Sequence, residues 1–523
     1  MKDTVLKKGA SRRARRVYLI IYTVVLFLAA CMIAASTYKR VQFGDSGLDE
    51  ILFYATSGLT HEQADRFMAV IEGGLFIAIP VFITLTIPLI ALYRNEANMT
   101  AKVKSPSQSR WAQFTAVRAM PLYLALVMTG SLWFSWNSFA VGEYIQSLTR
   151  VNTIFEDHYV DPRQANVTFP EEKRNLVYIY LESMENTVAS REAGGQYTTS
   201  RIPELEALAL DSTNISFSHQ ASGLGGALPL TGTTWTSAAM AAQSMGVPLK
   251  HSLFNTDGPD NREYKQFLPG AYGIGDVLKA EGYNQTFIMG SRAAFGGRNA
   301  MLGQHGDYQI IDYNRAQTSG MIPKGYDVWW GYEDNKLFEF ARHEMTRLAE
   351  ENKPFNLQLL TADTHFTDGY LDAQCPTPYA QKYDNVYACS SRQVAEFVQW
   401  IQQQPFSDTT TIVLVGDHLG MQAPYYNAII TDNDTFQRTT YNVILNSAVT
   451  TERRHNRLFS SFDLYPTTIA ALGATIEGER LGLGVNLFSN KQTLVEEYGR
   501  YEVLNQELGK RSEYYEQTIL RNK

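Results

Sequence analysis

Three long stretches without a charged residue constrain this chain more than any other feature of its sequence. They cover residues 17–38, 73–93 and 119–141. Each matches the roughly 20 apolar residues that a helix needs to cross a bilayer. We therefore expect three transmembrane helices in an N-terminal membrane domain of residues 1–150. Small residues near the end of the first stretch leave signal-peptide cleavage open, but its length favours a retained anchor.

Lysine and arginine residues beside these stretches predict their direction in the membrane. The N-terminus and the loop of residues 94–118 are rich in both, whereas the loop between the first two stretches is richer in acids. The positive-inside rule then puts the N-terminus in the cytoplasm. With three spans, everything after about residue 142 lies outside the cytoplasm.

A juxtamembrane linker of residues 151–170 precedes a region in which short apolar runs alternate with helical periodicity. The runs are residues 176–181, 286–289, 355–360 and 411–415, and the expected helices are residues 275–281, 336–351, 391–404 and 463–472. This alternation predicts an α/β domain over residues 171–490, with a mostly parallel sheet flanked by helices. We expect residues 491–523 to form a solvated helical tail. The net charge of −7 gives no reason to expect a nucleic-acid partner.

Polar residues follow each of the four expected strands. They are Glu182 and Ser183, then Arg292 and Arg298, then residues 361–365 with His365, and finally Asp417 and His418. Since α/β sheets bind ligands beyond the carboxyl ends of their strands, we expect these residues to converge. An adjacent carboxylate and imidazole suit a divalent metal. The alternative is a set of ordinary helix caps, among them an Asp with an unrelated His beside it.

A run of small hydroxyl residues, 231–237, precedes an alanine-rich segment that we expect to be helical. Threonine is a good N-cap, which is the structural interpretation. In the functional interpretation one threonine is a nucleophile at the helix N-terminus, where free N–H groups and the helix dipole favour an alkoxide and bind phosphate. Coordination by a metal would activate such a hydroxyl.

Several stretches resemble one family. NLVYIYLES, TGTTWTSAAMAAQSMGVPL, FLPGAYGIGDVLKAEGY, TADTHFTDGYLDAQC and VLVGDHLGM are similar to the membrane-anchored phosphoglycerol transferases, which include phosphoglycerol transferase I and the lipoteichoic acid synthases. The resemblance covers about residues 170–490. It implies an alkaline-phosphatase/sulfatase-like fold in a protein of the bacterial cell (inner) membrane, and one divalent metal, Mn²⁺ first with Mg²⁺ or Zn²⁺ as alternatives.

The resemblance also implies a reaction. Glycerophosphate would move from phosphatidylglycerol, through a metal-activated threonine that is covalently modified, to a glycan or glycerophosphate polymer such as periplasmic glucan or lipoteichoic acid. By motif, the metal ligands are Glu182, Thr233, Asp417 and His418. Thr233 resembles the nucleophile, with Thr234 and Thr236 as neighbouring candidates. Arg298 resembles a residue that grips the phosphoryl oxygens, and His365 one that contacts the glycerophosphate.

Two positions depart from the lipoteichoic acid synthases. Their Trp two residues before the Arg is Gly296 here, and their His near the end of the preceding strand falls at about Met289. These departures argue against the lipoteichoic branch. The resemblance is closer to the glucan-modifying branch, through FLPGAYGIGDVLKAEGY and the paired cysteines in the stretch after His365.

Cys375 and Cys389 lie fourteen residues apart in the exported part. We expect them to form a disulfide, because extracytoplasmic compartments permit one. Cys31 lies in the first span and is expected to act as a small apolar residue.

Three other functions are associated with the same fold. A sulfatase needs a Cys/Ser-x-Pro-x-Arg segment, but Cys375 is followed by Pro-Thr-Pro-Tyr and no such segment is present. A phosphoethanolamine transferase would use the same metal and threonine chemistry. A catalytically inactive membrane scaffold or sensor would keep the fold without the complete set of site residues.

Overall fold

A computed structural model of the chain describes residues 2–44, 48, 51–52, 61–102, 106–250, 266–431 and 436–521. The chain divides into two compact units. The first lies within residues 1–48 and 59–144, and the second within residues 49–58 and 145–523. Each unit is described by itself.

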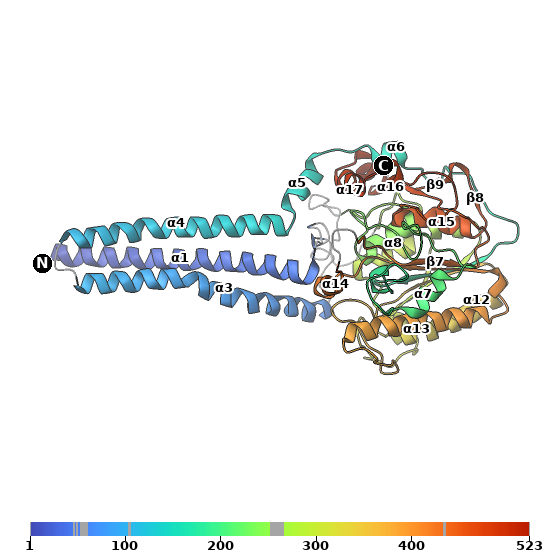
Figure 1. Cartoon of the computed structure of the whole chain (residues 1–523), viewed down its shortest axis with the longest axis horizontal. Helices are drawn as coiled ribbons and strands as arrows, with labels where there is room; N and C mark the ends of the chain where they lie inside the picture. The colour runs from blue at the N-terminus through green and yellow to red at the C-terminus, as the bar shows by residue number, and fades with distance from the viewer. Residues whose placement is uncertain are drawn as a thin grey trace. The chain divides into compact units, whose positions relative to one another are not determined.

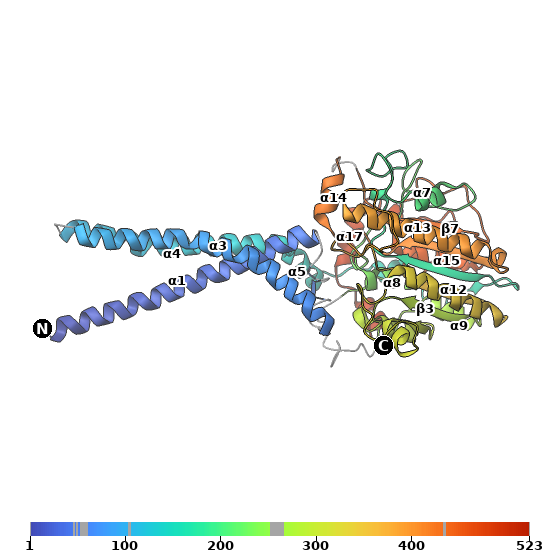
Figure 2. The same cartoon turned by 90° about the horizontal axis from the view of Figure 1, so that it is seen from below.

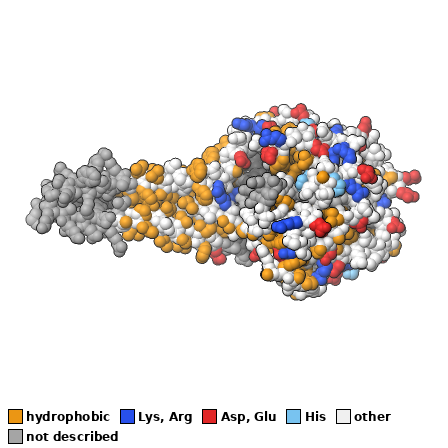
Figure 3. Space-filling model, viewed as in Figure 1, with side chains coloured by type: hydrophobic (Ala, Val, Ile, Leu, Met, Phe, Trp, Pro, Cys, Tyr) orange, Lys and Arg blue, Asp and Glu red, His pale blue; other side chains and the backbone are white. Residues whose placement is uncertain are grey.

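The first unit consists of three long helices that pack on one another (Figures 1 and 2). They are α1 (Lys2–Phe43), α3 (His61–Lys102) and α4 (Pro106–Ser138). Leu26 of α1 packs against Met120 and Leu124 of α4. Large apolar side chains face outward, with Phe76 82% exposed, and in Figure 3 orange hydrophobic side chains predominate on the coloured part of these helices. An apolar outer surface of this kind suits lipid better than water.

Two of these helices are long and apolar enough to cross a membrane. They are the segments Val17–Gln42 and Ile71–Ala91. A third span is formed only if Met120–Ser138 and Val141–Thr149, which meet at a bend of 61°, count as one. The transmembrane character expected from the sequence is therefore confirmed, with two to three candidate spans.

The second unit is built on a six-stranded sheet with the order β4-β3-β5-β2-β6-β7. The strands are β2 (Asn175–Leu181), β3 (Asn284–Met289), β4 (Gln309–Ile311), β5 (Phe355–Leu360), β6 (Thr410–Gly416) and β7 (Asn442–Leu445). All neighbours are parallel except β6 and β7. The four expected strands are confirmed, and β4 and β7 were not predicted. Two short pairs, β1 (Val167–Thr168) with β8 (Thr475–Ile476) and β9 (Arg480–Leu481) with β10 (Gly484–Val485), lie outside this sheet.

The sheet buries both of its faces, and its central strand β2 shows why. Leu176, Tyr178 and Tyr180 point into one hydrophobic core, and the alternate residues 177, 179 and 181 into another. On the first side lie α8 (Thr236–Met245), α9 (Ile274–Ala280), α10 (Arg298–Gln304) and α15 (Leu464–Ala471). On the second side lie α7 (Pro203–Leu210), α11 (Tyr313–Thr318), α12 (Asp334–Glu350), α13 (Lys382–Gln402) and α14 (Ala423–Ile429). A parallel strand covered on both faces reads as a continuous apolar run, as predicted for this fold class.

The C-terminal segment is helical as expected, but it is not solvated. It forms α16 (Leu494–Tyr498), α17 (Tyr501–Gly509) and a last turn at Tyr515–Ile519. Leu504 and Leu508 are fully buried in the first hydrophobic core. The expectation of a solvated tail is therefore wrong, because these leucines, spaced by four residues, give α17 an apolar face that the domain covers. The short helices α5 (Val141–Thr149) and α6 (Ile154–His158) lead into this unit.

We predict that Leu508→Ala destabilises the second unit by about 2–5 kcal/mol, because it removes a buried side chain and leaves a cavity. Thermal unfolding of the full chain in detergent, followed by circular dichroism, measures the change. Glu502→Ala, at an exposed position of the same helix, is the matched control. Equal unfolding temperatures for the two variants would show that the tail does not contribute to the core.

Candidate functional site

The central strands bring their carboxyl ends to the same level. Tyr180 of β2 pairs with Leu360 of β5, and Leu181 pairs with Gly416 of β6. The next residues of the three strands, Glu182, Thr361 and Asp417, therefore emerge side by side. The Glu182 backbone N–H donates to Thr361 Oγ1 at 2.9 Å, and the backbone N–H of residue 183 donates to Asp417 Oδ1 at 2.8 Å.

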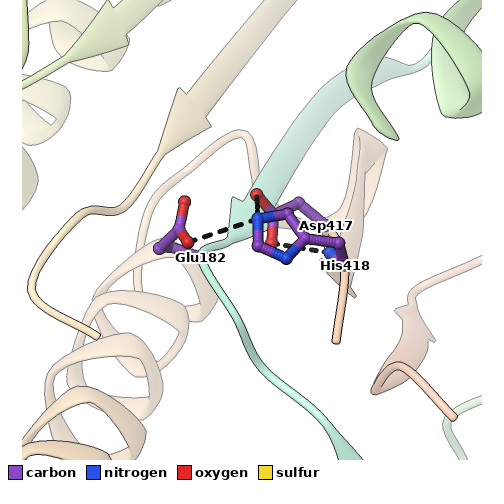
Figure 4. Close-up of side chains that lie close together, drawn as sticks. All are labelled: Glu182, Asp417 and His418. Carbon is purple, nitrogen blue, oxygen red and sulfur yellow. Dashed lines mark hydrogen bonds and ion pairs between the residues drawn. The ribbon is translucent and has the colours of Figure 1, made fainter. Parts of the chain in front are cut away.

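Glu182, Asp417 and His418 form a compact buried cluster (Figure 4). Each offers one ligand atom, and these atoms lie within 4.8 Å of one another. His418 Nε2 is 3.4 Å from Glu182 Oε1 and 3.5 Å from Asp417 Oδ2. None of the three residues is more than 2% exposed. The convergence expected from the sequence for these residues is present in the structure.

Burial and mutual charge shift the pKa values of all three groups in this cluster. Burial raises the pKa of Asp417, and the Glu182 carboxylate raises it further. Burial alone would lower the pKa of His418, but the two carboxylates outweigh burial and raise it. For Glu182, burial would raise the pKa, but the charges of His365 and His418 lower it. Asp417 Oδ2 is buried and accepts no hydrogen bond from any residue that the structure describes. Two carboxylates, one imidazole and an oxygen without a hydrogen bond fit a divalent cation.

The threonine that reaches this cluster is Thr236, the first residue of α8. Its hydroxyl donates to Glu182 Oε2 at 3.2 Å and lies 3.4 Å from His418 Nε2. The hydroxyl of Thr233 is engaged elsewhere, since it donates to the Leu230 carbonyl at 2.9 Å and accepts from the Leu230 N–H at 3.0 Å. The structure thus does not bring Thr233 to the cluster, and the expectation for the nucleophile shifts to its neighbour Thr236.

A pocket opens beside the cluster and includes the two residues expected to bind substrate. It is lined by Glu182, Thr236, Ser291, Phe295, Arg298, Trp330, Leu360, Thr361, Ala362 and His365. The Arg298 guanidinium donates to Ser291 Oγ and to the backbone carbonyl of residue 292, both at 3.1 Å. The His365 ring meets the Trp330 ring edge to face, with centroids 4.5 Å apart. The structure therefore brings Arg298 and His365 to the same pocket as Glu182 and Thr236.

Sequence reasoning missed the aromatic wall of this pocket. Phe295 and Trp330 lie 5.4 Å apart by ring centroids, and they come from different segments of the chain. Trp330 follows none of the strands of the sheet, so the rule of reading strand ends could not find it. Thr361, which directly follows β5, was among the residues expected at this edge of the sheet.

Cys375 and Cys389 are joined in a disulfide, with their Cα atoms 5.6 Å apart. Cys389 lies in α13, and Cys375 lies in the loop that follows His365. Neither sulfur lines the pocket. The bond therefore ties the loop after His365 to a buried helix, and its contribution to the site is indirect.

Comparison with known proteins finds relatives that share the region containing these residues. A protein-family model described as Sulfatase matches residues 174–474. The chain is 30% identical over 291 residues to phosphoglycerol transferase I of Citrobacter koseri, which is 54% of this chain and 35% of that protein. It is 31% identical over 276 residues to the protein of the same name from Salmonella paratyphi B, which is 51% of this chain and 33% of that protein. The matched part thus spans about a third of the length of these relatives.

Solved structures of similar proteins include the lipoteichoic acid synthase LtaP of Listeria monocytogenes. It is 15% identical, covers 64% of this chain and 81% of its own, and has a TM-score of 0.47. A protein of the alkaline phosphatase superfamily from Vibrio parahaemolyticus is 18% identical, covers 67% of this chain and 77% of its own, and has a TM-score of 0.46.

We predict that Cys375 and Cys389 resist alkylation in the denatured, unreduced chain, where only Cys31 reacts, and that all three react after reduction. Closing a loop of 14 residues contributes about 3 kcal/mol, so reduction should also lower the unfolding temperature. Peptide mass spectrometry after alkylation measures the labelling. Labelled Cys375 and Cys389 without reductant would contradict the disulfide.

Proposed function

The chain belongs to the sulfatase family, and from this premise we propose that it is a membrane-anchored phosphoglycerol transferase. It moves glycerophosphate from phosphatidylglycerol to a hydroxyl of an extracytoplasmic glycan or glycerophosphate polymer. The observation that carries this proposal is the Thr236 hydroxyl, 3.2 Å from Glu182 in a pocket that Arg298 also lines. The relatives named phosphoglycerol transferase I support the same reaction. The chain lacks the Cys/Ser-x-Pro-x-Arg segment of the sulfatase reaction.

Thr236 is the proposed nucleophile. With its hydrogen held by Glu182 Oε2, the Thr236 oxygen keeps lone pairs available for an incoming phosphorus. As its proton passes to Glu182 Oε2, the Thr236 oxygen bonds to the phosphorus of phosphatidylglycerol, and the bond between phosphorus and the diacylglycerol oxygen breaks. The leaving oxygen takes up a proton from His365, which lines the pocket and does not belong to the cluster of Glu182, Asp417 and His418. An acceptor hydroxyl then loses a proton to His365 and attacks the phosphorus, and Thr236 leaves and takes back its proton from Glu182.

Arg298 stabilises the charge on the phosphoryl oxygens. Its guanidinium is fixed by Ser291 Oγ and by the backbone carbonyls of residues 292 and 295, so little reorganisation is needed when substrate binds. Preorganised positive charge of this kind is the main source of rate enhancement in phosphoryl transfer.

Glu182, Thr236, Asp417 and His418 are the proposed ligands of one divalent ion, with Mn²⁺ first and Mg²⁺ or Zn²⁺ as alternatives. Such an ion, when bound, supplies positive charge that stabilises phosphoryl oxygens and lowers the pKa of a hydroxyl that it binds. The buried Asp417 oxygen without a hydrogen bond supports this assignment.

The charges of the pocket favour glycerol over ethanolamine as the transferred head group. Among the described residues that line the pocket, Glu182 is the only carboxylate, whereas Arg298 and His365 are basic groups. With Glu182 committed to the metal, no carboxylate is left to pair with an ammonium group, and Arg298 repels one. A neutral glycerol carries no such penalty. Phosphoethanolamine transfer is the alternative that the experiment below separates.

The apolar helices supply the anchor in this proposal. We propose that α1, α3 and the bent pair of α4 and α5 cross the bacterial inner membrane, with the N-terminus in the cytoplasm. The catalytic unit then works outside the cytoplasm, where phosphatidylglycerol of the outer leaflet and a polymer acceptor are both available.

We predict that Thr236→Ala lowers diacylglycerol release from labelled phosphatidylglycerol by about a thousandfold or more, because the nucleophile is lost. Thr233→Ala is the matched control. It removes two side-chain hydrogen bonds of the preceding turn but keeps the hydrogen bond from the Thr233 N–H to the Leu230 carbonyl, so it should lower activity by about a hundredfold at most. Thin-layer separation of the labelled products measures both.

The same assay separates the alternatives. An inactive Thr233→Ala beside an active Thr236→Ala would overturn the assignment of the nucleophile. Release from phosphatidylethanolamine, with none from phosphatidylglycerol, would identify the protein as a phosphoethanolamine transferase.

We predict that Glu182→Gln weakens Mn²⁺ binding by about a hundredfold, because a neutral amide replaces a carboxylate ligand. Isothermal titration of the metal-stripped full chain in detergent measures the affinity. Glu192→Gln, at an exposed carboxylate of the same unit, is the control. Failure of the unaltered chain to bind Mn²⁺, Mg²⁺ or Zn²⁺ would favour an inactive scaffold.

A further inference from the structure

Thr236 depends on a tight turn for its position at the start of α8. The Thr233 N–H and hydroxyl both donate to the Leu230 carbonyl, and the Leu249 N–H donates to the Gly232 carbonyl at 2.9 Å. Gly232 has φ +78°, and a Cβ there would lie 2.8 Å from Pro248 Cβ. The turn is therefore closely packed, and any shift in it is passed on to Thr236.

The C-terminal segment of residues 501–519, which we call the C-terminal clamp, holds this turn from outside. The Thr231 N–H donates to Asn505 Oδ1 at 2.6 Å, and the Thr231 hydroxyl donates to the same oxygen at 2.9 Å. The Tyr501 hydroxyl donates to the Pro229 carbonyl. Beyond α8, the Tyr515 hydroxyl donates to the Pro248 carbonyl at 2.7 Å. The clamp thus grips the chain both before and after α8; α8 and α17 are labelled in Figures 1 and 2.

The clamp is itself firmly supported. Leu504 and Leu508, on either side of Asn505, are fully buried in the core. The Asn152 side-chain amide donates to the carbonyls of Glu507 and Lys510 at 3.0 and 2.9 Å. The core and the Asn152 side chain both hold α17 in place. The Asn505 side-chain oxygen is therefore fixed in position and can determine where Thr231 lies.

No residue of the clamp lines the pocket, so the clamp does not contact the reacting atoms. Its effect on catalysis has to pass through the turn to Thr236, five residues beyond Thr231. A displacement of about 1 Å at a reacting group can lower a rate about a hundredfold. A polar contact outside the pocket can therefore be important for turnover.

We propose that the C-terminal clamp positions Thr236 for attack on phosphorus, and that Asn505 is the positioning residue through which it acts. This inference rests on the proposed function in that it takes Thr236 as the nucleophile. Asn505 sets the location of Thr231 through the two hydrogen bonds that its Oδ1 accepts, with a longer one from the Thr231 hydroxyl to the Asn505 backbone carbonyl at 3.3 Å, and Thr231 sets the turn. The remaining clamp contacts keep α17 in place.

The test compares three variants of the full chain in detergent. Asn505→Ala removes the shared acceptor, Asn505→Asp keeps an oxygen that can accept both hydrogen bonds, and Gln506→Ala changes an exposed neighbour on the same helix. We expect Asn505→Ala to lower kcat for diacylglycerol release by about ten- to a hundredfold, with KM changed less than about twofold. Asn505→Asp and Gln506→Ala should retain kcat within about threefold, and all three should bind Mn²⁺ within about tenfold of the unaltered chain, because Glu182, Asp417 and His418 stay in place.

Hydrogen–deuterium exchange provides a readout that does not depend on activity. In Asn505→Ala, amides of residues 230–233 should exchange at least about tenfold faster, while those of β2 and β6 stay unchanged. Unaltered kcat in Asn505→Ala, or unaltered exchange of the turn, would overturn the inference. A loss of kcat matched by lost metal binding and faster exchange throughout the unit would also overturn it, because the role of Asn505 would then be general stability.

The exchange result also separates this inference from the proposed function. If the unaltered chain releases diacylglycerol from neither phosphatidylglycerol nor phosphatidylethanolamine, the proposed function fails. The exchange rates of residues 230–233 in Asn505→Ala then test by themselves whether Asn505 fixes the position of the turn.

Discussion

The carboxylates of Glu182 and Asp417 are buried beside the imidazole of His418, and much of the catalytic unit is arranged to make this possible. Removing charged groups from water costs several kcal/mol each unless hydrogen bonds and opposite charges compensate. Here the backbone N–H groups of residues 183 and 418 donate to Asp417, and the Ser183 hydroxyl donates to Glu182. A divalent ion would complete the compensation, which links the stability of this edge of the sheet to its proposed chemistry.

The register of three parallel strands supplies the geometry that this cluster needs. Because β5, β2 and β6 are neighbours and end at the same level, residues far apart in the sequence meet without a specialised loop. The two hydrophobic cores fix the strands from both sides, and α8 brings Thr236 to the cluster from the first of them. The position of Thr236 then depends on where α8 begins, which the preceding turn and the C-terminal clamp determine.

The sequence predicted most of this arrangement because its strongest signals are local. Buried parallel strands read as apolar runs, and the residues directly after them are easily identified, so the four central strands and the cluster of Glu182, Asp417 and His418 were expected. The strands β4 and β7 are only three and four residues long, too short to stand out. Which threonine faces the cluster could not be derived, since it depends on the residue at which α8 starts. Trp330 reaches the pocket through tertiary packing alone, and the burial of α17 depends on a surface formed by distant segments.

In the proposed reaction, Thr236 carries the glycerophosphoryl group between donor and acceptor. The most direct measurement is peptide mass spectrometry of the full chain, quenched in acid after brief incubation with phosphatidylglycerol and Mn²⁺ and without an acceptor. We expect one glycerophosphoryl group on the peptide that contains Thr236, localised to that residue by fragmentation and removed when an acceptor is added. Diacylglycerol release without any modified threonine, or with the group on Thr233, would contradict it.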